Sequence, residues 1–265
     1  MYQVKKIIVP ILALLILALG FGGCVQQPRV AEPTKEEKSA RALQSAKVHT
    51  ELAGEYFNRG QMDVALEEVD EALKAEPNYA PAYNVLGLVN MKLNDDAKAL
   101  QNFTQALKLT PENAEIRNNY GWFLCQRVSQ QMDQAIEQFT QAIQNPLYTT
   151  PEMALTNAGI CEIKRQRYDE AQAYLRKALL IQPSYFTALL ALVDMDFRRG
   201  RLVEAKSKLV ELMQNNSSTP ESLLLAIQIE QAIGDQMSAD SYIFQLQKRF
   251  PDSREAISVR EGKIN

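Results

Sequence analysis

The sequence predicts an all-α fold built from six stacked helix pairs. Three observations predict it: one pattern of small and apolar residues recurs along the chain, its usual period is about 34 residues, and a proline closes each copy. Such a period is typical of helix–turn–helix repeats that stack into a solenoid. Because each repeat contacts only its neighbours, a chain of 265 residues needs no single large core.

The full pattern has a small residue, then alanine, an apolar residue and alanine at regular spacings, and then a proline. The second copy, for example, is Gly87, Ala99, Phe103, Ala106 and Pro111. The six copies start at Ala53, Gly87, Gly121, Gly159, Val193 and Ile227, so that the starts are evenly spaced except for one longer step from Gly121 to Gly159. The fifth copy is weaker, because Leu212 replaces the second alanine and the proline is delayed to Pro220; the sixth has Ile227, Ala239, Ile243, Leu246 and Pro251.

The pattern has a mechanical reason. Small residues let two antiparallel helices approach closely, the apolar residue fills the space between repeats, and proline ends one unit before the next begins. The pattern resembles the tetratricopeptide repeat, which implies a right-handed superhelical solenoid. We expect repeats at 46–79, 80–113, 114–151, 152–185, 186–219 and 220–253, and a C-terminal extension over 254–265.

The longer step between the third and fourth copies contains two small insertions. Two extra residues fall near Arg127–Gln131 and two more near Pro146–Pro151. Both positions are predicted connections, so the helices keep their phase. We expect a local change of superhelical angle, which would divide the array into two semi-rigid halves unless the loops absorb the insertions.

The N-terminus has the pattern of a sorting signal. Lys5 and Lys6 precede an apolar run of about 14 residues, which is shorter than the roughly 20 needed to span a bilayer. Gly22 and Gly23 then lead into Cys24. This segment resembles a lipoprotein signal, which implies cleavage after residue 23 and lipidation of Cys24; an ordinary secretory signal or a membrane anchor is the alternative.

Residues 24–45 are polar and contain two prolines, and we interpret them as a lipidated N-terminus with a tether that becomes helical near its end. By resemblance to enterobacterial lipoproteins, the absence of aspartate after Cys24 implies the outer membrane, on its periplasmic face. Cleavage would remove Lys5 and Lys6 and no acidic residue, so the mature chain would carry a larger negative charge than the −3 of the whole sequence. That charge argues against a nucleic-acid partner.

In a helix-pair solenoid of this kind, the first helices of successive repeats line a concave groove. Their inward positions combine amides with apolar and aromatic groups, which suits an extended peptide. The predicted groove residues are Asn84, Leu88, Met91, Asn118, Trp122, Thr156 and Ile160. Trp122 is the only tryptophan and the natural anchor for a partner, although it could instead pack between helices.

Cys125 and Cys161 occupy the first helices of neighbouring repeats, on either side of the longer step. An oxidising periplasm would permit a disulfide that restrains this joint. Two buried thiols that act as small core residues are the alternative, because sequence alone provides no distance between them.

Nothing in the sequence favours catalysis or a cofactor. His49 is the only histidine, and the chain has no CxxC, no glycine-rich phosphate loop and no GxSxG motif. The acidic residues are interpreted mostly as solvated helix faces. We therefore expect no enzyme activity, no cofactor, no metal and no small-molecule substrate.

The signal, tether and six repeats, together with the stretch NNYGWFLC from Asn118 to Cys125, are similar to the PilF/PilW family of type IV pilus biogenesis proteins. The resemblance implies a pilotin that binds secretin subunits and promotes their outer-membrane localisation and multimerisation, and we expect a monomer when it is free. The alternative is a periplasmic lipoprotein adaptor for cell-wall enzymes or for outer-membrane protein assembly.

Overall fold

The computed structural model describes residues 34–263, and its regular structure over that range is entirely helical. Within these residues there are thirteen α-helices and one short 3-10 helix, η1. Their bounds are α1 Lys35–Asn58, α2 Met62–Ala75, α3 Ala80–Lys92, α4 Asp96–Leu109, α5 Ala114–Arg127, η1 Ser129–Gln131, α6 Met132–Gln144, α7 Pro151–Lys164, α8 Tyr168–Ile181, α9 Phe186–Arg198, α10 Leu202–Asn215, α11 Pro220–Ile233, α12 Gln236–Arg249 and α13 Arg254–Arg260.

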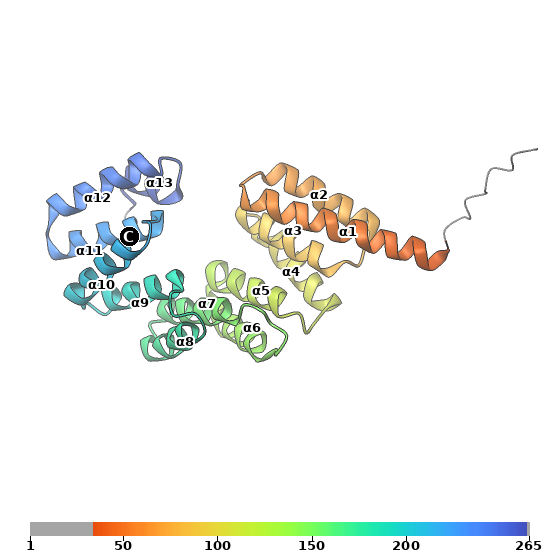
Figure 1. Ribbon diagram of the computed structural model, residues 1–265, viewed down its shortest axis with the longest axis horizontal. Helices are drawn as coiled ribbons and strands as arrows, with labels where there is room; N and C mark the ends of the chain where they lie inside the picture. The colour runs from red at the N-terminus through yellow and green to blue at the C-terminus, as the bar shows by residue number, and fades with distance from the viewer. Residues whose placement is uncertain (1–33, 264–265) are drawn as a thin grey trace, which may run out of the picture.

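Helices α1 to α12 form six consecutive pairs, and each pair packs against the next. The pairs follow a curved path, so that the two ends of the array lie on the same side of an arc (Figure 1). Near the middle of the arc, α5 and α7 lie on its inner side, whereas α6 and α8 lie outside (Figure 1). The predicted superhelical solenoid of six helix pairs is confirmed.

In the second to fourth repeats, close approach within a pair depends on the glycine that begins the copy of the pattern. A Cβ atom on Gly87 would lie 2.8 Å from the Phe103 ring, and one on Gly159 would lie 2.7 Å from Leu175 Cγ. Both apolar partners are completely buried. The glycine on the first helix and the bulky side chain on the second therefore interlock, as the pattern predicts.

The turn inside a pair uses one residue with positive φ, at the same position in five of the six repeats. Glycine fills it in three, whereas Asn94 (φ 62°) and Gln166 (φ 60°) fill it in two. The third repeat is the exception, because its longer turn forms η1 instead. The second insertion lengthens the connection between α6 and α7 to residues 145–150, compared with 110–113 between α4 and α5. Both insertions thus lie in connections, and the helices keep their phase.

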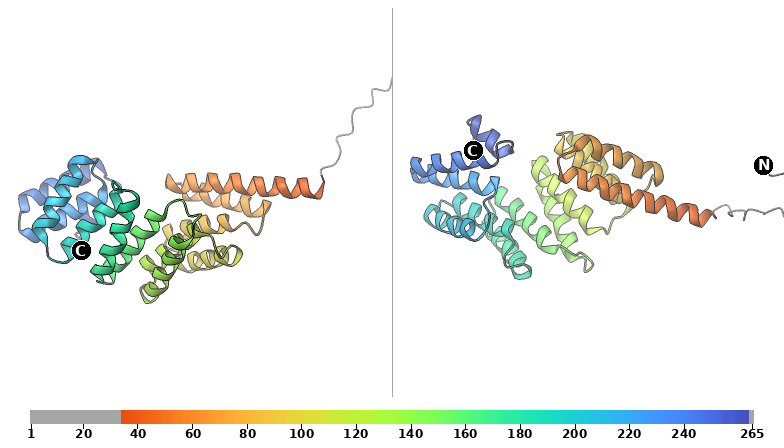
Figure 2. Two further views of the ribbon diagram at one scale, coloured as in Figure 1. Left: turned by 60° about the horizontal axis from the view of Figure 1, so that its bottom comes forward. Right: turned by 45° about the horizontal axis from the view of Figure 1, so that its top comes forward.

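Helix α1 begins at Lys35, well before the end of the segment predicted as a tether, residues 24–45. Thr34 caps it by accepting a hydrogen bond from the Glu37 amide, and the Glu37 carboxylate accepts one from the Thr34 amide in return. Residues 35–45 are thus helical and project beyond α2 (Figure 2). The predicted signal (1–23), Cys24 and the first part of the tether lie outside the described residues.

The C-terminal extension contains one short helix, α13, which packs on α11 and α12. Ala256 and Val259 are buried there and cover the apolar end of the last repeat. Within residues 34–263, no helix combines the length and the apolar character needed to cross a membrane.

Candidate functional site

The first helices of the pairs surround two hollows. The first has a volume of about 810 Å³ and lies among α1, α3, α5, the start of α7 and the connection between α6 and α7. Its apolar lining includes Phe57, Leu88 and Tyr148, and its polar lining is dominated by asparagine and threonine side chains. Leu147, in the same connection, is 86% exposed. The two extra residues that follow α6 therefore contribute to the rim of this hollow.

A chain of amide hydrogen bonds joins three first helices beside the first hollow. Asn157 Nδ2 on α7 donates to Asn118 Oδ1 on α5 over 2.9 Å, and Asn119 Nδ2 donates to Asn84 Oδ1 on α3 over 3.2 Å. A longer contact of 3.5 Å, from Asn118 Nδ2 to Asn119 Oδ1, connects the two halves. These amides thus hold neighbouring repeats in register, as a polar ladder across their packed helices.

Three predicted groove residues are less available than expected. Asn84 is 4% exposed, and Asn118 and Thr156 are each 1% exposed. Asn84 and Asn118 use their amides in the ladder, and the Thr156 hydroxyl donates to the Glu152 carbonyl within its own helix. Asn118 and Thr156 pack between first helices and line neither hollow, so the prediction that these two line an open groove is corrected, whereas Asn84 lines the first hollow.

The apolar groove residues are more accessible. Leu88 lines the first hollow, while Trp122 and Ile160 line the second. Trp122 is half-buried and also packs against the core of the third repeat, as does Met91. Met91 lines neither hollow, and its carbonyl accepts a hydrogen bond from Arg127. A partner-binding role for any of these residues stays a prediction.

The second hollow has a volume of about 380 Å³ and is formed by α5, α7, α9, α11 and α13. Each of the last four repeats contributes one large apolar side chain from its first helix, and α11 contributes a second leucine next to the first. Charged residues surround them. Both hollows thus lie on the helices that the sequence assigned to the concave face.

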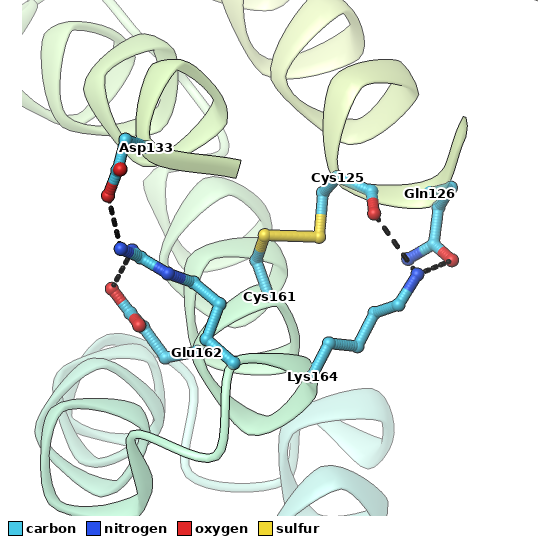
Figure 3. The surroundings of a disulfide bond; sticks show 7 residues. Cys125, Gln126, Asp133, Cys161, Glu162 and Lys164 are labelled. Atoms are coloured by element: carbon cyan, nitrogen blue, oxygen red, sulfur yellow. Dashed lines mark hydrogen bonds and ion pairs between the residues drawn. A yellow bond between two sulfur atoms is a disulfide. The ribbon is translucent and has the colours of Figure 1, made fainter. Parts of the chain in front are cut away.

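A disulfide joins Cys125 on α5 to Cys161 on α7, with a Cα–Cα distance of 5.8 Å (Figure 3). Both residues are buried. Lys164 lies beside the bond and donates from Nζ to the Cys125 carbonyl and to Gln126 Oε1, over 3.0 and 3.2 Å (Figure 3). Burial lowers the pKa of Lys164, and the charge of Arg198 lowers it further. The structure thus links the third and fourth repeats both covalently and by hydrogen bonds.

Three buried carboxylates occupy one equivalent position, a turn after the small residue, in the last three repeats: Glu162, Asp196 and Glu230. Glu162 pairs with Arg165, Asp196 with Arg201 and Lys208, and Glu230 with Lys206. Burial raises the pKa of Glu162, although Arg165 and Arg167 act against that rise. The interpretation of acids as solvated faces missed these three, although their recurrence with the period of the repeat was visible in the sequence.

The described residues hold no group of three or more side chains that could bind a metal ion. His49 contacts the Glu68 carboxylate at 2.6 Å, in the first pair and away from both hollows. The hollows themselves offer shape, amides and carboxylates, which are the means of binding a polypeptide.

Residues 50–114, 126–184 and 156–211 match the tetratricopeptide repeat family. These segments cover more than half of the chain, which therefore belongs to the tetratricopeptide repeat family, whose members are typically scaffolds for protein–protein interaction.

Relatives place the chain more narrowly. It is 26% identical over 240 residues to the type IV pilus assembly protein PilF of Pseudomonas aeruginosa, covering 91% of this chain and 93% of that protein. A crystal structure of PilW, a widely conserved type IV pilus biogenesis factor, superposes with a TM-score of 0.68 at 34% identity, covering 82% of this chain and 98% of that one. A structure of P. aeruginosa PilF has a TM-score of 0.63 at 24% identity, over 84% of this chain and all of that one, which supports the fold. Within its family, the chain is a PilF/PilW-type protein.

Proposed function

We propose that this chain is an outer-membrane lipoprotein pilotin, which binds the type IV pilus secretin and promotes its localisation and multimerisation there. In this role the chain is needed for pilus biogenesis and for twitching motility. The observation that carries the proposal is the similarity to PilF and PilW, which extends over nearly the whole chain rather than over a few repeats.

The predicted lipid anchor at the N-terminus supports the part of the proposal that concerns localisation of the secretin. A lipidated Cys24 would carry several acyl chains, and each buried methylene contributes about 0.8 kcal/mol to membrane binding. A protein anchored in this way brings its bound partner to the same surface. Because both components are then confined together, their effective concentration rises and ring assembly becomes favourable.

The two hollows supply the binding surface. Half-buried apolar groups in both hollows suit the side chains of a bound segment, and the polar groups around them suit its backbone. Trp122 is the strongest candidate anchor, because large amphipathic side chains in a pocket contribute most to protein–protein affinity. Trp122→Ala should therefore weaken secretin binding, while truncation of Leu180, which is 83% exposed on α8, should leave it unchanged.

The test is the state of the secretin in unboiled membrane fractions, compared between cells with the chain, without it, and with Cys24→Ala. Loss of multimers without the chain, and multimers at the inner membrane in the Cys24 variant, are the expected results. Normal multimers in the outer membrane of all three strains would contradict the proposal. They would favour a lipoprotein adaptor for cell-wall enzymes or for outer-membrane protein assembly.

A further inference from the structure

The second hollow is lined by large apolar groups that the fold leaves partly uncovered. Trp122, Ile160, Leu190 and Leu224 come from α5, α7, α9 and α11 and are each only half-buried. Each packs against a repeat core and also lines the hollow. A volume of about 380 Å³ falls in the range of ligand-binding pockets and accommodates a large side chain with part of its backbone.

The charges around this hollow are not balanced. Among the residues that the structure describes, Arg198 is the only cation in the lining, and its Nε donates to both carboxylate oxygens of Asp194, over 2.8 and 2.9 Å. Glu221 and Glu255 also line the hollow, and neither forms an ion pair within residues 34–263. Once the Asp194–Arg198 pair is set aside, two negative charges remain beside an apolar surface.

Among the described residues, the first hollow also has two carboxylates in its lining, Glu112 and Glu115, and no lysine or arginine, but a larger share of its lining is polar. Its amides are largely engaged with the protein itself: Asn84 and Asn119 bond to each other, Asn113 caps α5, and Asn145 bonds to the Glu112 carbonyl. It therefore provides a matched acidic surface on the same face, with a lining in which polar groups take a larger share.

We propose that the second hollow binds a peptide segment of a partner protein in which a large apolar side chain is adjacent to a basic residue. The apolar side chain enters among Trp122, Ile160, Leu190 and Leu224, and the basic group lies against Glu221 and Glu255. Opposite charges at the edge of an apolar pocket select among partners and fix the orientation of the bound segment. This inference rests on the proposed function only in taking the first-helix face as the partner-binding surface.

Trp122 is the only tryptophan in the chain, so its fluorescence reports directly on this hollow. The probes are three short peptides, acetylated and amidated at their ends: one with leucine between two lysines, one with leucine between two glutamates, and one with serine between two lysines. The lysine–leucine peptide should change the emission saturably and bind about tenfold tighter than either counterpart. Salt should weaken its binding, because at least one of the two carboxylates is exposed.

The variant for this test is Glu221→Gln with Glu255→Gln, which should remove the preference for lysine over glutamate. The matched control is Glu112→Gln with Glu115→Gln at the first hollow, which should retain it; circular dichroism checks that both variants are folded. No saturable change with any peptide, equal affinity for the lysine and glutamate peptides, or an unaltered preference in the folded double variant would each overturn the inference. Secretin multimerisation is measured separately. If the peptide does not bind but secretin multimers still depend on the chain, this inference alone is rejected. If the peptide binds as expected but the multimers do not depend on the chain, the proposed function alone is rejected.

Discussion

The first four repeats and the last two reach the same helix–turn–helix shape by different packing. In the second to fourth repeats, a glycine on the first helix faces a bulky residue on the second, such as Gly87 with Phe103. In the last two, the corresponding positions hold two branched or long residues, Val193 with Leu209 and Ile227 with Ile243. The two helices of the fifth pair accordingly share less close backbone contact than those of the first four.

The last repeats have an additional stabilising device. Asp196 and Glu230 are buried and paired with lysine or arginine, whereas Asn90 and Leu124 occupy the same position in the second and third repeats. The fourth repeat has both devices, with Gly159 and Glu162. The last two repeats thus combine a larger residue at the position of the interlocking glycine with a buried, paired carboxylate one turn later.

The largest effect should come from removing the interlocking ring. Phe103→Ala should lower the free energy of unfolding by about 3–5 kcal/mol, because Phe103 is completely buried. Adding Gly87→Leu should restore part of that loss, since leucine fills space next to the position that the ring leaves, in the manner of the last repeats. Urea denaturation followed by circular dichroism measures both, and strictly additive losses in the double variant would show that the two positions do not interlock.

Loss of the disulfide should have the next largest effect on stability. The bond lies among the repeats in which a glycine faces a bulky residue. Replacing both Cys125 and Cys161 with alanine should cost about 2–4 kcal/mol, because the bond closes a loop over a sequence separation of 36 residues. The unmodified chain in reducing agent is the control and should lose a similar amount. If the variant and the oxidised chain have the same melting temperature, the bond contributes nothing to stability.

A smaller effect is expected from a single methyl group at a close approach. Gly121→Ala should cost about 1–3 kcal/mol, because its Cβ would lie 2.9 Å from the Phe139 ring and 3.1 Å from the Ala135 carbonyl oxygen. Gly54 is the matched control: it also lies inside a first helix, but a Cβ there meets nothing within 4 Å. Gly54→Ala should raise stability by about 0.5–1 kcal/mol, and thermal melts that move in the same direction for both variants would refute the interlock.

The smallest effect concerns the buried carboxylate of the fourth repeat. Burial raises the pKa of Glu162 above its ordinary value of 4.5, so the folded chain holds this proton more tightly than the unfolded chain. Its contribution to the free energy of unfolding therefore falls as pH rises from the unfolded pKa through the raised folded pKa. Glu162→Gln should reduce that fall, and parallel pH–stability curves for the two proteins would contradict the raised pKa.

Periodicity predicted most of the fold because each repeat is determined by contacts that are local in sequence. The spacing from Gly87 to Phe103, for example, is the spacing of two residues that touch. The insertions were predicted in connections for the same reason, since a shift within a helix would have broken the pattern.

The candidate site was less predictable, because it depends on distances between repeats. Nothing in the sequence shows that Cys125 and Cys161 are 5.8 Å apart at Cα, or that Asn118 bonds to Asn157 on the next first helix. The expectation that an inward position is open to a partner therefore failed at Asn118. The helical start of α1 was expected only near the end of the tether, although Thr34 and Glu37 form a recognisable capping box.

The length of α1 has a geometric consequence. Its first ten or so residues extend past the end of α2, and at about 1.5 Å per residue they form a rod of roughly 15 Å. A rod transmits orientation as well as distance, which a random coil does not. The direction of α1 therefore sets where Thr34 lies relative to the array, about three helical turns beyond the first pair.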